Sequence, residues 1–167
     1  DLFHKDVPET FILRVFDVMR RASWHRFAAL TKRSERLREM SPRLSWPSNV
    51  WMGVSVENAA YRYRIDDLRA TGAAVKFLSL EPLLGPVPAM DLKGIDWVMV
   101  GGESGPGARP MQRDWVLEIR DQCKSANVPF TFHQWGGEHR TETGRLLDGR
   151  IYNEKPPAAR DPQLTLF

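Results

Sequence analysis

Short apolar runs alternate with amphipathic segments along most of this chain. A short apolar run bounded by turn residues is typical of a strand buried on both faces. Such runs are residues 26–31, 50–56, 75–80, 95–100 and 128–134. Apolar positions with helical spacing predict helices over 7–22, 34–40, 59–71 and 114–126. Strands that alternate with helices predict an α/β fold with a mostly parallel sheet.

Polar residues and glycines follow each predicted strand where it ends. The candidate site residues at these ends are Ser55, Glu57, Asn58, Glu81, Gly101, Gly102, Glu103, Ser104 and Gln134. In a (βα) barrel the carboxyl ends of the strands share one face, and active sites lie there. Three glutamates on that face suit a cationic ligand, a metal or acid–base chemistry. The alternative is that each glutamate caps a helix or forms an ion pair.

The segment from Ile95 to Met111 changes from an apolar run into a glycine-rich loop. Its glycines match neither GxGxxG nor the P-loop, so nucleotide phosphates are not expected to bind by those routes. Arg109, in the same loop, either binds an anion or pairs with Glu103. We interpret the loop as one wall of a site shared with Glu57 and Glu81.

Composition and charge set broad limits on the function. The 167 residues carry a net charge of +3 and a pI near 9.2, which permits a nucleic-acid partner without requiring one. Cys123 is the single cysteine, which excludes an intramolecular disulfide and a multi-cysteine metal site.

No apolar run approaches the ~20 residues of a membrane span, so we expect a cytoplasmic protein without a membrane partner. Residues 1–154 are predicted to form one domain and 155–167 a Pro/Ala-rich tail.

Longer motifs carry a resemblance to a known family. They are residues 30–33 (LTKR), 50–58 (VWMGVSVEN), 77–86 (FLSLEPLLGP), 95–111 and 134–136 (QWG). Over residues 1–156 the chain resembles a largely uncharacterised family of phage-associated, radical-SAM-like proteins. The resemblance implies a partial (βα) barrel. It also implies an N-terminal loop whose cysteines hold a [4Fe–4S] cluster and S-adenosylmethionine.

The sequence departs from this family at its start. The cysteine-bearing segment and the first strand or strands are absent, so the chain resembles the C-terminal two-thirds of such a protein. Cys123 lies in a predicted helix and does not replace the cluster thiolates, so we expect no cofactor and no cluster-dependent activity in this chain alone. His133 stands where the family is expected to have Lys. The catalytic residues are not assigned.

The last five residues carry an independent motif. Gln163, Leu164, Leu166 and Phe167 belong to a QLTLF sequence that resembles the pentapeptide by which bacterial DNA polymerases and repair proteins dock on the sliding clamp. Short apolar anchors on a flexible leash suit a groove on a partner. The alternative is a chance match, or side chains that cover the protein's own core.

Two classes of function follow from these observations. The first is a radical-SAM-like enzyme of nucleic-acid repair or modification. In it Glu57, Glu81, Glu103, Ser104 and Gln134 line the S-adenosylmethionine or substrate site, and Arg109 meets a carboxylate or phosphate. The second is a non-catalytic module that docks on the sliding clamp or a partner subunit. The missing cysteines favour the second for this chain, and the family pattern favours the first for a longer parent.

Overall fold

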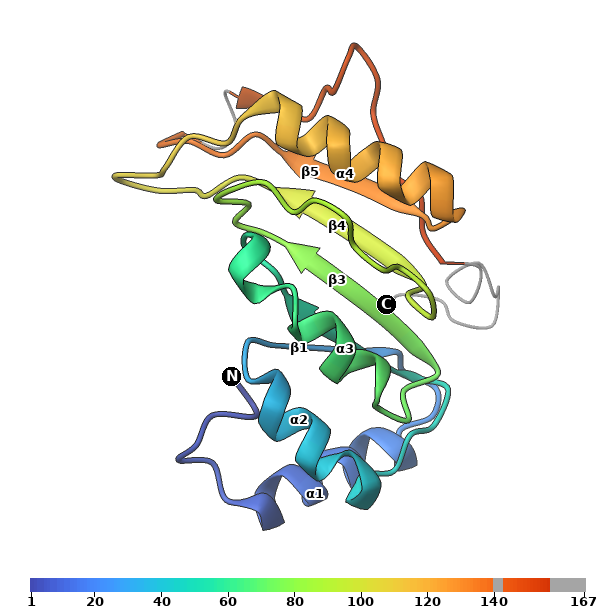
Figure 1. Ribbon diagram of the computed structural model, residues 1–167. Coiled ribbons are helices and arrows are strands. Elements are labelled where there is room, and N and C mark those ends of the chain that lie inside the picture. The colour runs from blue at the N-terminus through green and yellow to red at the C-terminus, as the bar shows by residue number, and fades with distance from the viewer. Residues whose placement is uncertain (140–142, 157–167) are drawn as a thin grey trace.

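The computed structural model describes residues 1–139 and 143–156 and contains one sheet with helices between most of its strands (Figure 1). The strands are β1 (Phe27–Thr31), β2 (Val50–Ser55), β3 (Val75–Leu80), β4 (Trp97–Gly101) and β5 (Phe130–Gln134). The helices are α1 (Glu9–Arg21), α2 (Ser34–Met40), α3 (Arg64–Arg69) and α4 (Arg113–Ala126), with short 3-10 helices η1 (Ser41–Arg43) and η2 (Ala59–Tyr61). The mixed α/β architecture is as predicted.

All five strands run parallel, and their order in the sheet is their order in the chain. The register places Ser55 beside Ser79. An irregularity after Val100 places Gly101 beside Gln134. Because the strands are parallel, the residues that end or follow them lie at one end of the sheet. We call residues 32, 55–58, 81, 101–104 and 133–134 the carboxyl edge.

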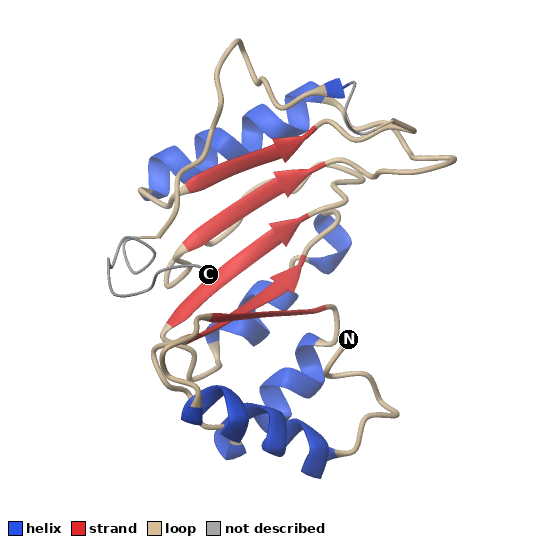
Figure 2. Cartoon of the chain, turned by 180° about the vertical axis from the view of Figure 1, so that it is seen from behind, coloured by secondary structure: helices blue, strands red, loops and turns tan. Residues whose placement is uncertain are grey.

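Helices cover one face of the sheet. Helices α3 and α4 lie in front of the strands in Figure 1 and behind them in Figure 2. Alternate strand residues face these helices, because successive side chains point to opposite sides of a strand. Met52, Leu78 and Val98 are among them and are fully buried. Burying one such side chain contributes about 1.5–3 kcal/mol, so this face holds the main core.

The other face has its own, smaller apolar cluster. It consists of Trp51, Val75 and Phe77, with the half-buried Trp97 and Met99 packed against them. The ring of Phe77 lies over Gly53, where a Cβ would come within 2.2 Å of it. Figure 2 shows this face toward the viewer with no helix in front of the strands. Aromatic side chains that cover one another therefore fill the face that the helices leave open.

The two outer strands of the sheet differ in their surroundings. The outer side of β5 is bridged in antiparallel fashion by the segment around Asn153. Leu147 and Arg150 pair across Asp148 and Gly149, which both have positive φ, as a two-residue Asp-Gly turn between paired residues requires. Within the described residues β1 is hydrogen-bonded to β2 alone, so the sheet is open.

The predicted strands are confirmed to within two residues at either end, but the helix predicted over 59–71 is not continuous. It is divided into η2 and α3, and Arg64, the first residue of α3, turns inward and donates to the Ser55 carbonyl of β2. On α1 the apolar side chains of Phe11 and Val18 are both more than half exposed. In the described residues no helix is long and apolar enough to cross a membrane.

Candidate functional site

Three side chains form a hydrogen-bonded cluster at the carboxyl edge, between β3 and β5. His133 Nδ1 lies 2.7 Å from Glu81 Oε2. Gln134 Nε2 donates to Glu81 Oε1 at 3.0 Å and to the Gly102 carbonyl at 2.8 Å. An ionised carboxylate only accepts hydrogen bonds, so opposite an ionised Glu81 it is Nδ1 of His133 that donates, and Nε2 is the ring nitrogen that Glu81 does not engage. A histidine oriented in this way is suited to take up a proton at Nε2.

Two glycines let the strands come close enough to build this cluster. A Cβ on Gly101 would lie 2.6 Å from Glu81 Oε1, and one on Gly102 would lie 2.0 Å from the carbonyl oxygen of Trp135. A side chain at Gly101 would force the Glu81 carboxylate to move, and one at Gly102 would clash with backbone atoms that cannot rotate away. The two glycines therefore position the Glu81 carboxylate and the loop after β5.

Glu57 forms a second group at the carboxyl edge, on the β2 side. Its carboxylate binds the Lys32 ammonium and accepts a hydrogen bond from Arg64 Nη1 at 2.9 Å. Burial raises the pKa of the Glu57 carboxyl. The hydrogen bonds from Lys32 and from a backbone amide, with the charges of Lys32 and Arg64, outweigh burial and hold the pKa below its usual range. Glu57 is thus a buried, ionised anchor for two cations.

Glu103 and Arg109 close the glycine-rich loop. Arg109 Nη2 donates to Glu103 Oε1 at 2.6 Å, while its Nε and backbone amide both donate to Oε2 at 2.8 Å. The hydrogen bonds from the Arg109 side chain and backbone lower the pKa of Glu103 to about 2. Of the two roles considered for Arg109, the structure shows the ion pair.

The other predicted site residues have local contacts. Ser55 is buried beside Ser79, and the Asn58 side chain accepts a hydrogen bond from the Ala60 amide at 2.9 Å and so caps η2. Ser104 is exposed and pairs with Gly137 through the backbone. In the described part of the chain none of these three side chains hydrogen-bonds to the Glu81–His133–Gln134 cluster.

The three glutamates share the carboxyl edge, but each has its own partners. Glu57 binds two cations, Glu81 binds His133 and Gln134, and Glu103 binds Arg109. Across residues 1–139 and 143–156, no group of three or more His, Cys, Asp or Glu side chains is arranged to hold a metal ion. The carboxyl edge therefore carries separate ion pairs at Glu57 and Glu103, with the Glu81–His133 pair as a third group. The charge of Lys32 also contributes to the low pKa of Glu103, which places it within electrostatic range of that group.

Three residues in or beside this edge were not among the predicted site residues. Lys32 and Arg64 were not singled out from the sequence, and His133 was noted only as standing where the family is expected to have Lys. The signal available for His133 was its place beside Gln134 at a strand end, as for Glu57 and Glu81. Arg64 gave no such signal, because its burial depends on where Glu57 lies in three dimensions.

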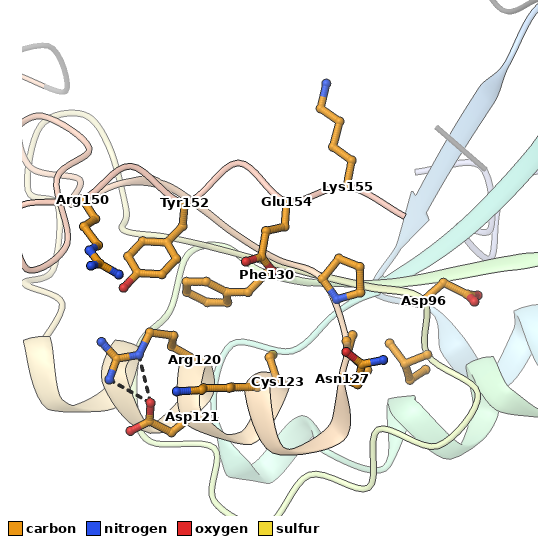
Figure 3. Close-up of a pocket in the computed structure, with 14 residues that line it drawn as sticks. Asp96, Arg120, Asp121, Cys123, Asn127, Phe130, Arg150, Tyr152, Glu154 and Lys155 are labelled. Carbon is orange, nitrogen blue, oxygen red and sulfur yellow. Dashed lines mark hydrogen bonds and ion pairs between the residues drawn. The ribbon is translucent and has the colours of Figure 1, made fainter. Parts of the chain in front are cut away.

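A cavity lies at the other end of the sheet (Figure 3). It has a volume of about 980 Å³ between α4 and the segment 150–155. Phe130 and Tyr152 line it, and Arg120 lies there bound to Asp121. Burial raises the pKa of the Cys123 thiol to about 12, so this cysteine is a packed side chain and not a nucleophile. The cavity shares no residue with the carboxyl edge.

Comparison with known sequences identifies the family. A family described as "Protein of unknown function (DUF5131)" matches residues 1–156. The chain belongs to this family. No curated protein and no solved structure matches the chain. The DUF5131 match covers both groups of the carboxyl edge and the Glu103–Arg109 loop. Gln163, Leu164, Leu166 and Phe167 lie beyond the match and outside the described residues.

Proposed function

We propose that this DUF5131 chain is the C-terminal part of a radical-SAM-like protein of nucleic-acid repair or modification, in which the carboxyl edge forms one wall of the site. The observation that carries the proposal is the Glu81–His133–Gln134 cluster at the carboxyl ends of parallel strands. Sites of (βα) barrels lie in this position. A five-stranded open sheet, with helices on one face alone, suits a partial barrel.

The residues present do not fit a [4Fe–4S] cluster. Such a cluster needs several thiolates, and the single cysteine is buried with a raised pKa. No chemistry of this chain is therefore routed through a cluster. In the proposal, any cluster is held by another part of the protein or by another chain.

The carboxyl edge does fit S-adenosylmethionine. Gln134 Oε1 is buried and has no hydrogen-bond partner within the described residues, and such an atom is costly unless a donor reaches it. The ammonium and adenine amino groups of S-adenosylmethionine are donors of this kind, and Glu81 lies beside the same amide. When bound, this cofactor supplies a reactive carbon on its sulfonium. In this proposal Gln134 and Glu81 hold it, and His133 Nε2 takes up or returns a proton.

Glu81→Gln tests the cofactor site. The change keeps the shape of the side chain and removes the charge that accepts from a donor cation, so S-adenosylmethionine should bind about tenfold more weakly than to the wild type. Isothermal titration calorimetry with the whole chain measures this. The matched control is Glu118→Gln, an exposed position on α4, which should bind like the wild type. Equal affinity of all three proteins, or no binding by the wild type, would contradict the assignment.

The tail supports a second proposal, docking on the bacterial sliding clamp. The supporting observation is the sequence QLTLF at 163–167. Pro156 and Pro157 come before this motif in the sequence, and proline disfavours a continuous helix leading into it. The double variant Leu166→Ala, Phe167→Ala removes two apolar anchors and should weaken binding to purified clamp at least about a hundredfold. Fluorescence anisotropy with labelled chain measures this. Pro156→Ala is the matched control, and a double variant that binds as tightly as the control would refute docking.

A further inference from the structure

A basic pocket lies beside β1, next to the Glu57 group. Its volume is about 470 Å³, and its charged lining residues include Lys5, Lys32, Arg33, Glu35, Arg36 and Arg64. Five of these six side chains are cationic, and Glu35 is the only carboxylate among the lining residues described. Such an excess of positive charge in a concave site favours an anion.

Two of these cations are free to meet a ligand. Arg36 donates to the carbonyl oxygens of His4 and Val7, and Lys32 binds Glu57. Lys5 and Arg33 are exposed and form no ion pair with any residue that the structure describes. Both line the same pocket, and an unpaired lysine and arginine are the side chains that proteins use to contact phosphate.

Arg64 gives an independent indication of a ligand. It is only 6% exposed, and its Nη1 donates to the Ser55 carbonyl and to Glu57. Its Nε is buried and has no hydrogen-bond partner in the described part of the chain. A buried N–H without an acceptor is costly, and Arg64 lines the pocket, so a shift of its side chain would bring this N–H to an oxygen-rich ligand there. Arg64 therefore links the pocket to the carboxyl edge and lacks an acceptor.

An aromatic ring completes the pocket. Tyr63 lines it and is 47% exposed, and its ring centroid lies 6.0 Å from the guanidinium carbon of Arg64. A basic groove with an exposed aromatic ring is the arrangement by which proteins bind single-stranded nucleic acid, since the cations contact phosphates and the ring stacks on a base. A duplex keeps its bases stacked within the helix and offers no free face to Tyr63.

We propose that this pocket binds one nucleotide unit of a single-stranded nucleic acid. Lys5 and Arg33 contact the phosphate, the phosphate oxygens accept from Arg64 Nε, and Tyr63 stacks on the base. Single-stranded nucleic acid would then be the substrate class of the adjoining carboxyl edge. The reaction on that substrate rests on the proposed function. Binding to the pocket can be tested without it. Inorganic phosphate, a mononucleotide and a single strand share the chemistry that the pocket recognises.

The test measures binding of a fluorescein-labelled single-stranded oligonucleotide to the whole chain at several salt concentrations. The double variant Lys5→Glu, Arg33→Glu should reduce the slope of log affinity against log salt by about two, because two phosphate contacts are lost. Tyr63→Ala should weaken binding about tenfold and leave the salt slope unchanged. The matched control is Arg14→Glu, Lys93→Glu, two exposed cations outside the pocket, which changes the net charge equally.

Competition with unlabelled ligands shows which phosphate-containing molecule the pocket prefers. Unlabelled single strand should displace the probe well below the concentrations that a mononucleotide, inorganic phosphate or duplex requires. A duplex that competes as well as the single strand would overturn the proposal, and so would equal binding by the pocket variant and its control. Either result leaves binding of S-adenosylmethionine unaffected, so failure of the pocket is distinguishable from failure of the proposed function.

Discussion

Gly102→Ala is expected to lower the free energy of unfolding by about 3 kcal/mol. A Cβ at this position would lie 2.0 Å from the Trp135 carbonyl oxygen and 2.9 Å from the Gly136 amide nitrogen. These are backbone atoms, which cannot rotate away as the end of a flexible side chain does. The loops after β4 and β5 must therefore separate, and the hydrogen bond from Gly102 to Gln134 is lost with them. Urea denaturation followed by circular dichroism measures the change.

Gly107→Ala is the matched control for this substitution. Gly107 has φ +75°, and a Cβ there would meet nothing within 4 Å. Its replacement should therefore cost only the strain of a left-handed residue, about 1 kcal/mol. If Gly102→Ala were no more destabilising than Gly107→Ala, the close approach of the two loops would be wrong.

The second large effect concerns Glu57→Gln. At neutral pH the substitution leaves Arg64 as a buried cation without its anion, which should cost about 3–5 kcal/mol. The pKa of Glu57 is lower in the folded protein than in the unfolded chain. Its charge therefore stabilises the fold at pH values above the unfolded pKa of about 4.3, and this stabilisation is lost as the pH falls through the folded pKa.

The difference in stability between wild type and Glu57→Gln should accordingly shrink as the medium becomes more acidic. Chemical denaturation at pH 7 and at several values below pH 4.5 measures it. Glu39→Gln, an exposed position on α2, should differ little from the wild type at any pH. A deficit of Glu57→Gln that stays constant down to the acid limit would show that the lost charge is not its cause.

The sequence predicted the fold well where local patterns decide it. Strand β3 is an apolar run that ends in Ser79, Leu80 and Glu81, and the structure places it within the sheet with Glu81 at the carboxyl edge. The parallel arrangement follows from the alternation of strands and helices. The pairing of Glu103 with Arg109, one of the two roles considered for Arg109, is likewise local, since the two lie six positions apart in the chain.

The sequence did not reveal the contacts that depend on how separate strands and helices pack together. Arg64 looks like a helix-surface arginine, and it is buried because β2 ends beside α3 and places Glu57 within reach. His133 meets Glu81 from 52 positions away, a contact that depends on the register of β3, β4 and β5. The three glutamates were expected to form one site, but each of them is bound to its own set of side chains.

The order of the strands bears on how this protein can be made. Each strand pairs with the strand that precedes it in the chain, so every new strand finds its partner already synthesised. The sheet can therefore grow from β1 onward while the chain leaves the ribosome, with no early strand waiting for a late one. The exception is the last element: Asn153 and its neighbours must be released before the outer side of β5 is bridged. Until then, the outermost strand of the growing sheet has unpaired backbone N–H and C=O groups, which could pair with strands of other chains.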